Sequence, residues 1–197
     1  MTTPGVVAIG TSWGGLSALG RILSSLPGDF RSPIIVVQHR SKDSDNLLAK
    51  LLQDISDLKI HEAEDKDTLL PSHVYVAPAD YHLLVDAGEV SLTVDAPFRY
   101  SRPSIDVAFE SVARSFGSAA IGVVLTGAND DGARGLARII ALGGQGIVED
   151  PKTAEMPVMP EAAKRASPSA EVLPLQDIPA RLVRMVNAPG QMKRKAG

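Results

Sequence analysis

The sequence contains no cysteine, which excludes a disulfide framework, a zinc site built on thiolates and a cysteine nucleophile. Long hydrophobic runs are also missing, since apolar stretches such as residues 33–37 and 119–125 are far shorter than the roughly 20 residues of a membrane span. The first ten residues, MTTPGVVAIG, have neither the basic region nor the apolar stretch of a signal peptide. We therefore expect a soluble, cytoplasmic protein with no membrane insertion.

The sequence also has no large excess of positive or negative charge. The 20 Lys and Arg against 23 Asp and Glu give a net charge of −3, which argues against a nucleic-acid partner bound by a basic face. Hydrophobic residues make up 44% and charged residues 22% of the 197 residues, which excludes a disordered chain. We predict one folded domain, with neither a metal site nor a cofactor.

Short apolar runs alternate with amphipathic stretches, a pattern typical of βα units and of an α/β fold with a mostly parallel sheet. Two neighbouring runs, 82–85 and 90–94, are joined by a short turn and predict an antiparallel β-hairpin added to this sheet. The strands expected in the parallel part are 6–10, 34–38, 74–77, 121–125, 146–148 and 171–173.

Polar residues of the types that carry out catalysis follow three of these strands. Ser12 comes after the first strand, His39 after the second, and Asp130 and Asp131 after the run 121–125. Because parallel strands bring their carboxyl ends to one edge of the sheet, the three loops should meet there. Serine, histidine and a carboxylate are the parts of an activated hydroxyl nucleophile, and the spacing alone leaves the choice between the two aspartates open.

The turn after the first strand reads Gly-Thr-Ser-Trp-Gly and fits the G-x-S-x-G pattern of a nucleophile elbow, in which the backbone N–H of Trp13 faces the oxyanion. It also lies one substitution from the dinucleotide fingerprint G-x-G-x-x-G. Against nucleotide binding, Ser12 replaces the middle glycine, and His39 stands near the position of the ribose-binding acid. The order Ser, His, Asp also disfavours an α/β-hydrolase, whose order is Ser, acid, His.

Each of these residues has a simpler interpretation when taken singly. Ser12 would cap a helix, His39 would bond to backbone, and Asp131 would cap the helix that follows it. Trp13 either packs in the interior or lines the cleft. For Asp106, a surface role is favoured over a role in orienting a loop.

Five segments in order resemble the catalytic domain of the chemotaxis protein-glutamate methylesterase, CheB: VVAIGTSWGGLSAL, IIVVQH, VYVAPADYHL, RPSIDVAFESVA and IGVVLTGANDDGARG. The resemblance runs from about Gly5 to Val183. It implies a three-layer αβα domain with about seven mostly parallel strands. It also implies a serine esterase that hydrolyses methyl esters of glutamates on chemoreceptor proteins, releases methanol and deamidates some receptor glutamines.

Carried over by position, the resemblance makes Ser12 the nucleophile, His39 the base and Asp131, not Asp130, the acid. His82 falls near the cleft with no assigned role. The sequence departs from the family at Trp13, where a small residue is usual. It also departs at Leu16, Ala128 and the loop 155–160, which puts substrate preference in doubt more than the chemistry.

The domain expected is a single methylesterase domain over 1–197, with a core of about 5–186 and a flexible tail at 187–197. Members of the family often carry an N-terminal receiver domain, and we expect none before the first strand of this sequence. We therefore expect regulation from a partner, such as a separate regulatory or kinase protein, or through expression. The alternative function is a catalytically weak or inactive CheB-like module that binds receptors or signalling kinases.

Overall fold

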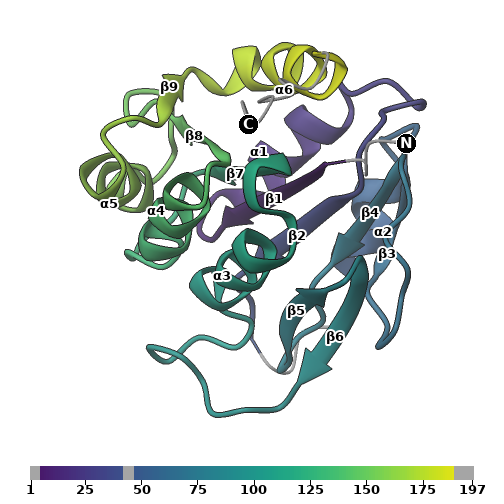
Figure 1. The fold of residues 1–197 in the computed structure, drawn as a ribbon. Helices are drawn as coiled ribbons and strands as arrows, with labels where there is room; N and C mark the ends of the chain where they lie inside the picture. The colour runs from purple at the N-terminus through teal and green to yellow at the C-terminus, as the bar shows by residue number, and fades with distance from the viewer. Residues whose placement is uncertain (1–4, 42–46, 189–197) are drawn as a thin grey trace, which may run out of the picture.

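The six expected parallel strands and one further strand, residues 59–62, form a seven-stranded sheet in a computed structural model that describes residues 5–41 and 47–188 (Figure 1). Its order is β3-β4-β2-β1-β7-β8-β9, and all of its neighbouring strands pair in parallel. The predicted α/β class is confirmed. The strands of the sheet are β1 (Val6–Thr11), β2 (Ile34–Gln38), β3 (Lys59–Glu62), β4 (His73–Val76), β7 (Ala120–Val124), β8 (Gln145–Glu149) and β9 (Glu171–Leu173).

Side chains alternate between the two faces of the sheet and form two hydrophobic cores. Val7 and Ile9 pack in one core, with α1, α2 and α6, whereas Val6 and Ala8 pack in the other, with α3, α4 and α5. Figure 1 shows the sheet between these helices, so the three-layer arrangement is confirmed. The helices are α1 (Gly15–Leu23), α2 (Leu47–Gln53), α3 (Ile105–Phe116), α4 (Ala133–Ala141), α5 (Val158–Ala166) and α6 (Ile178–Asn187).

The predicted hairpin is present but does not extend the main sheet. Its strands β5 (His82–Asp86) and β6 (Glu89–Thr93) pair with each other and form a separate two-stranded sheet. The backbone N–H of Val85 donates to Ser111 Oγ on α3 at 3.0 Å, and Leu83 and Val90 join the core on that side. The expectation of an added sheet strand is corrected, because the hairpin packs on a helix.

Two glycines allow the first turn of α3 to approach the ends of the central strands. A Cβ on Gly10, at the end of β1, would lie 2.2 Å from Ile105 Cγ2, and a Cβ on Gly132 would lie 2.7 Å from the same atom. Gly132 also has a φ of 92°, which favours glycine. The start of α3 therefore lies directly against the loops that follow β1 and β7.

Within residues 5–41 and 47–188, no helix combines the length and the apolar character needed to cross a membrane. Helix α6 ends at Asn187, and the single domain with a core of about residues 5–186 stays a prediction. Most of the predicted tail, residues 189–197, lies outside the described residues.

Candidate active site

Ser12, His39 and Asp131 follow three strands that are neighbours in the sheet, β1, β2 and β7. The backbone joins the first two loops, because the N–H of His39 donates to the carbonyl of Thr11 at 3.1 Å. The strand order thus brings together the three loops that the sequence predicted to meet.

His39 and Asp131 are in direct contact. His39 Nε2 lies 2.8 Å from Asp131 Oδ2, and the two side chains are only 12% and 3% exposed. Asp130, by contrast, is 62% exposed and pairs with Arg99 at 2.7 Å. The geometry therefore separates the two neighbouring aspartates, which spacing alone does not.

The Asp131 carboxylate also accepts hydrogen bonds from the N-terminus of α3. The backbone N–H groups of Ile105 and Asp106 donate to it at 2.7 and 2.9 Å, and Ser104 Oγ donates at 3.0 Å. Burial acts to raise the pKa of Asp131, but the hydrogen bonds and the charge of His39 outweigh it, so this pKa is lowered. Asp131 does bond to Gly132 N–H, as a cap of the following helix would, yet most of its contacts are to α3.

Asp106 is buried, with 5% exposure, so the expected surface role is wrong and the loop-orienting role fits. Its Oδ1 accepts the N–H groups of Gly132 and Gly135 at 2.9 and 2.7 Å, whereas its Oδ2 is buried without a hydrogen-bond partner. Burial raises the pKa of Asp106, and repulsion by Asp131 adds to that effect despite the backbone hydrogen bonds. Asp106 thereby fixes the segment that carries Asp131.

The turn that contains Ser12 is held by Gln38, at the end of β2, and by Thr126, just after β7. Ser12 N–H donates to the carbonyl of Thr126 at 3.0 Å, and Thr126 Oγ1 donates to the carbonyl of Trp13 at 2.9 Å. Gln38 Nε2 donates to the carbonyls of both Ser12 and His39, at 2.8 and 3.0 Å. Sequence reasoning missed Gln38 and Thr126, because both act on backbone atoms and leave no motif.

These contacts set the direction of two N–H groups. The carbonyls of Ser12 and Trp13 accept the bonds from Gln38 and Thr126. Because a peptide group is planar and trans, the N–H of the next residue, Trp13 or Gly14, points the opposite way. Within the part of the chain that the structure describes, the N–H groups of Trp13 and Gly14 have no acceptor. Gly14 has a φ of 79° and caps α1 without a side-chain bond, so the capping role is not that of Ser12. Successive free N–H groups of this kind bind anions.

The tautomer of His39 follows from its partners. With Nε2–H donated to Asp131, Nδ1 carries the lone pair and accepts from Asn129 Nδ2 at 3.3 Å. Asn129 Oδ1 accepts the N–H of Asp131 at 3.1 Å, which agrees with that orientation of the amide. Across the described residues, no hydrogen bond joins Ser12 Oγ to His39, and Asn129 occupies the atom that Ser12 would need.

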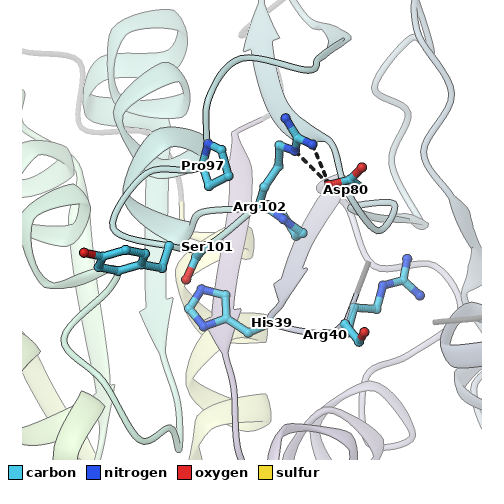
Figure 2. A pocket seen from close by; sticks show the side chains of 9 residues that line it. His39, Arg40, Asp80, Pro97, Ser101 and Arg102 are labelled. Carbon is cyan, nitrogen blue, oxygen red and sulfur yellow. Dashed lines mark hydrogen bonds and ion pairs between the residues drawn. The ribbon is translucent and has the colours of Figure 1, made fainter. Parts of the chain in front are cut away.

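An open cavity of about 520 Å³ lies beside His39 (Figure 2). Arg102 crosses it and binds Asp80 through two nitrogens, at 2.6 and 3.0 Å. Arg40 pairs with Glu62 and donates to the carbonyl of Ala77 at 3.0 Å. The cavity is therefore polar, with its charges largely paired.

His82 lies close to the site but does not face substrate. It is 2% exposed; its Nδ1 accepts the N–H of Ser104 at 3.2 Å, and its Nε2 lies 3.2 Å from the carbonyl of Ala96. Its effect is to hold Ser104, which donates to Asp131. Among the described residues, no three His, Cys, Asp or Glu side chains gather as a metal site would require.

Comparisons with known proteins find similar sequences and a similar fold. The family model for CheB methylesterase matches residues 7–182. A protein of Leptospira interrogans, named "Putative protein-glutamate methylesterase/protein-glutamine glutaminase", is 42% identical over 180 residues, which are 91% of this chain and 93% of that protein.

Longer relatives match in the same way. Protein-glutamate methylesterase/protein-glutamine glutaminase 4 of Myxococcus xanthus is 40% identical over 92% of this chain, which spans 52% of that protein. The crystal structure of the Thermotoga maritima CheB methylesterase catalytic domain superimposes with a TM-score of 0.89 and 34% identity. It covers 93% of this chain and 100% of that one. These matches favour the esterase interpretation of the Gly-Thr-Ser-Trp-Gly turn over nucleotide binding.

Proposed function

Because the chain belongs to the CheB methylesterase family, we propose that it hydrolyses methyl esters of glutamate side chains on chemoreceptor proteins, with Ser12, His39 and Asp131 as its catalytic groups. The observation that carries this proposal is the buried 2.8 Å contact between His39 and Asp131, directly beside the Ser12 turn. A buried carboxylate that holds one imidazole nitrogen leaves the other free to act as a base.

In the first half of the reaction, Ser12 Oγ attacks the ester carbonyl as His39 Nδ1 takes its proton. The bond to the methoxy group then breaks, and the same proton passes to the oxygen that leaves as methanol. The N–H groups of Trp13 and Gly14 face away from the anchored carbonyls and stabilise the oxyanion. Asp131 holds the imidazole in the required tautomer and stabilises its protonated form.

In the second half, water replaces methanol. His39 Nδ1 accepts a proton from that water, which attacks the acyl carbon, and the proton returns to Ser12 Oγ as the bond to the serine breaks. The products are the free glutamate side chain and the restored enzyme. Glutamine follows the same route with ammonia as the leaving group, in line with the glutaminase part of the relatives' names.

The turn must adjust before this reaction, since Asn129 holds Nδ1 and Ser12 Oγ has no bond to His39 among the described residues. Catalytic hydrogen bonds are often long or absent without substrate and form in the complex. The alternative, an inactive module that binds receptors or a signalling kinase, would also leave Ser12 without this bond. A serine-directed covalent probe decides between the two, because an adduct on Ser12 requires an activated hydroxyl.

The direct test measures methanol released from methylated receptor by the wild type and by Ser12→Ala. We expect the variant to lose turnover and keep its circular dichroism spectrum, because Ser12 Oγ makes no hydrogen bond among the described residues. Full activity of Ser12→Ala would exclude this mechanism. Regulation by a separate protein and a cytoplasmic location remain predictions from the sequence.

A further inference from the structure

Trp13 is the only tryptophan of the sequence, and it is 65% exposed. This exposure excludes the interior packing role, and Trp13 directly follows the proposed nucleophile. A single exposed apolar side chain is ordinary on a protein surface, and exposure alone therefore assigns no role. What separates Trp13 from the other exposed apolar residues is its place and the way it is held.

The indole of Trp13 has a hydrogen-bond partner at the surface. Its Nε1–H donates to Glu155 Oε1 at 3.2 Å, and the Glu155 carboxylate lies so close to Gly14 that a Cβ there would come within 2.7 Å of Oε2. The backbone of Trp13 is held as well, through the 2.9 Å bond from Thr126 to its carbonyl. A side chain that is already ordered loses little conformational freedom when a partner covers it.

The order of the strands places Trp13 on one side of the nucleophile and the cavity on the other. Along the edge of the sheet, Asp80 follows β4, His39 follows β2, Trp13 follows β1 and Glu155 follows β8, in the strand order β4-β2-β1-β7-β8. The polar cavity lies at the Asp80 and His39 end. The anchored indole extends from Ser12 toward the β8 end. A chain segment that runs along this edge with its ester on Ser12 passes over Trp13.

We propose that the Trp13 indole, anchored by Glu155, is the docking surface for apolar side chains that flank the esterified glutamate of the protein substrate. This rests on the proposed function, because it takes Ser12 as the point of attack. An interface tryptophan offers about 150–250 Å² of contact surface and is among the residues that most often dominate binding. The surface selects a protein segment by its sequence and does not take part in the chemistry.

The first experiment measures binding alone. Ser12→Ala protein is titrated with a tryptophan-free peptide that carries one glutamate methyl ester flanked by leucines, and with a matched peptide flanked by serines. Because Trp13 is the sole tryptophan, its fluorescence reports directly on the site. We expect the leucine peptide to bind more tightly, to shift the emission to shorter wavelength and to reduce quenching by acrylamide. Equal binding of the two peptides, or calorimetric binding with no change in emission, would overturn the proposal.

The second experiment measures turnover of the same two peptides. We expect Trp13→Thr to lower kcat/KM for the leucine peptide by about tenfold, mostly through KM, and to affect the serine peptide much less. Glu155→Ala should act in the same direction with a smaller effect. Glu155→Gln is the matched control, because its amide oxygen still accepts the indole N–H.

The outcomes separate the two proposals. An equal loss for both peptides in Trp13→Thr would mean that Trp13 acts only through the Ser12 turn, and no loss for either would mean that substrate does not touch it; both results contradict docking. If the wild type hydrolyses neither these peptides nor methylated receptor, the proposed function fails. The fluorescence titration then still decides whether Trp13 docks an apolar segment.

Discussion

Asp131 and Asp106 exchange hydrogen bonds across the starts of two helices, α3 and α4. Asp131, just before α4, accepts the N–H groups at the start of α3, and Asp106, in the first turn of α3, accepts those of Gly132 and Gly135 at the start of α4. Each carboxyl group thus lies at the positive end of a helix dipole. This exchange locks the two helix starts together and fixes the proposed catalytic acid.

Substitution of Asp106 should separate its hydrogen-bonding role from its charge. Asp106→Ala leaves the buried N–H of Gly135 without its acceptor, whereas the N–H of Gly132 keeps its bond to Asp131. One buried N–H without an acceptor costs about 1–3 kcal/mol, and we expect a loss of that size in the free energy of unfolding. Asp106→Asn keeps an acceptor oxygen and should lose far less. Urea unfolding of both variants measures this, and equal losses would show that the bonds to Gly132 and Gly135 do not matter.

The pH dependence of stability should reveal the raised pKa of Asp106. An unfolded Asp loses its proton near about pH 4, whereas folded Asp106 keeps it to higher pH. Its contribution to the free energy of unfolding therefore falls as pH rises from about 4 through the folded-state pKa. Asp106→Asn lacks this titration, so we expect its stability relative to the wild type to increase with pH in that window. A difference that stays constant between about pH 4 and pH 7 would contradict the prediction.

The two neighbouring aspartates should differ sharply in their effect on catalysis. Asp131→Asn removes the carboxylate that fixes the His39 tautomer, and we expect kcat to fall by about 10⁴-fold. Asp130→Asn is the control, because its exposed pairing with Arg99 contributes little, and its kcat should stay close to that of the wild type. Comparable losses in the two variants would remove the distinction that the geometry makes.

Asn129 should slow the enzyme by holding His39 Nδ1. Asn129→Ala removes one neutral hydrogen bond from the resting state, worth about 1 kcal/mol, and we expect kcat on a small ester to rise about fivefold. The ring stays oriented by Asp131. A fall in kcat would show instead that the Asn129 amide keeps His39 in its reactive orientation.

Gln38 should matter more for rate than for stability. Gln38→Met removes the donor that joins the Ser12 and His39 loops and also removes the buried Oε1, which has no hydrogen-bond partner. We expect kcat to fall by about 10²-fold, the effect of a displacement of roughly 1 Å, with little change in the urea midpoint. If stability falls in proportion to kcat, Gln38 supports the fold and not the spacing of Ser12 and His39.

The strands predicted from the sequence are those with continuous apolar runs, such as Val6–Thr11 and Ala120–Val124, because both faces of the inner sheet are buried. The edge strand Lys59–Glu62 was missed, since only Ile60 of its four residues is buried. The hairpin was predicted, but whether it pairs with the sheet or packs on α3 depends on tertiary contacts such as that of Val85 with Ser111.

For the candidate site, the sequence supplied the residue types and the resemblance supplied the choice of Asp131. The burial of Asp106 was not predicted, because a carboxylate in a first helical turn is usually solvated, and only the approach of Gly132 and Gly135 gives it partners. Asn129 and Thr126 were missed for a related reason. Their partners are a ring nitrogen and main-chain atoms from distant segments, and no spacing within the sequence records such contacts.

The loops of Ser12, His39 and Asp131 follow β1, β2 and β7, inner strands with a neighbour on each side, whereas β3 and β9 form the edges. Local opening usually begins at such edges and leaves the innermost strands to exchange their amide hydrogens only through global unfolding. The strands that position the three groups therefore belong to the last cooperative unit to open. Fraying of either edge should leave their alignment intact, and the enzyme should keep working until the whole domain unfolds.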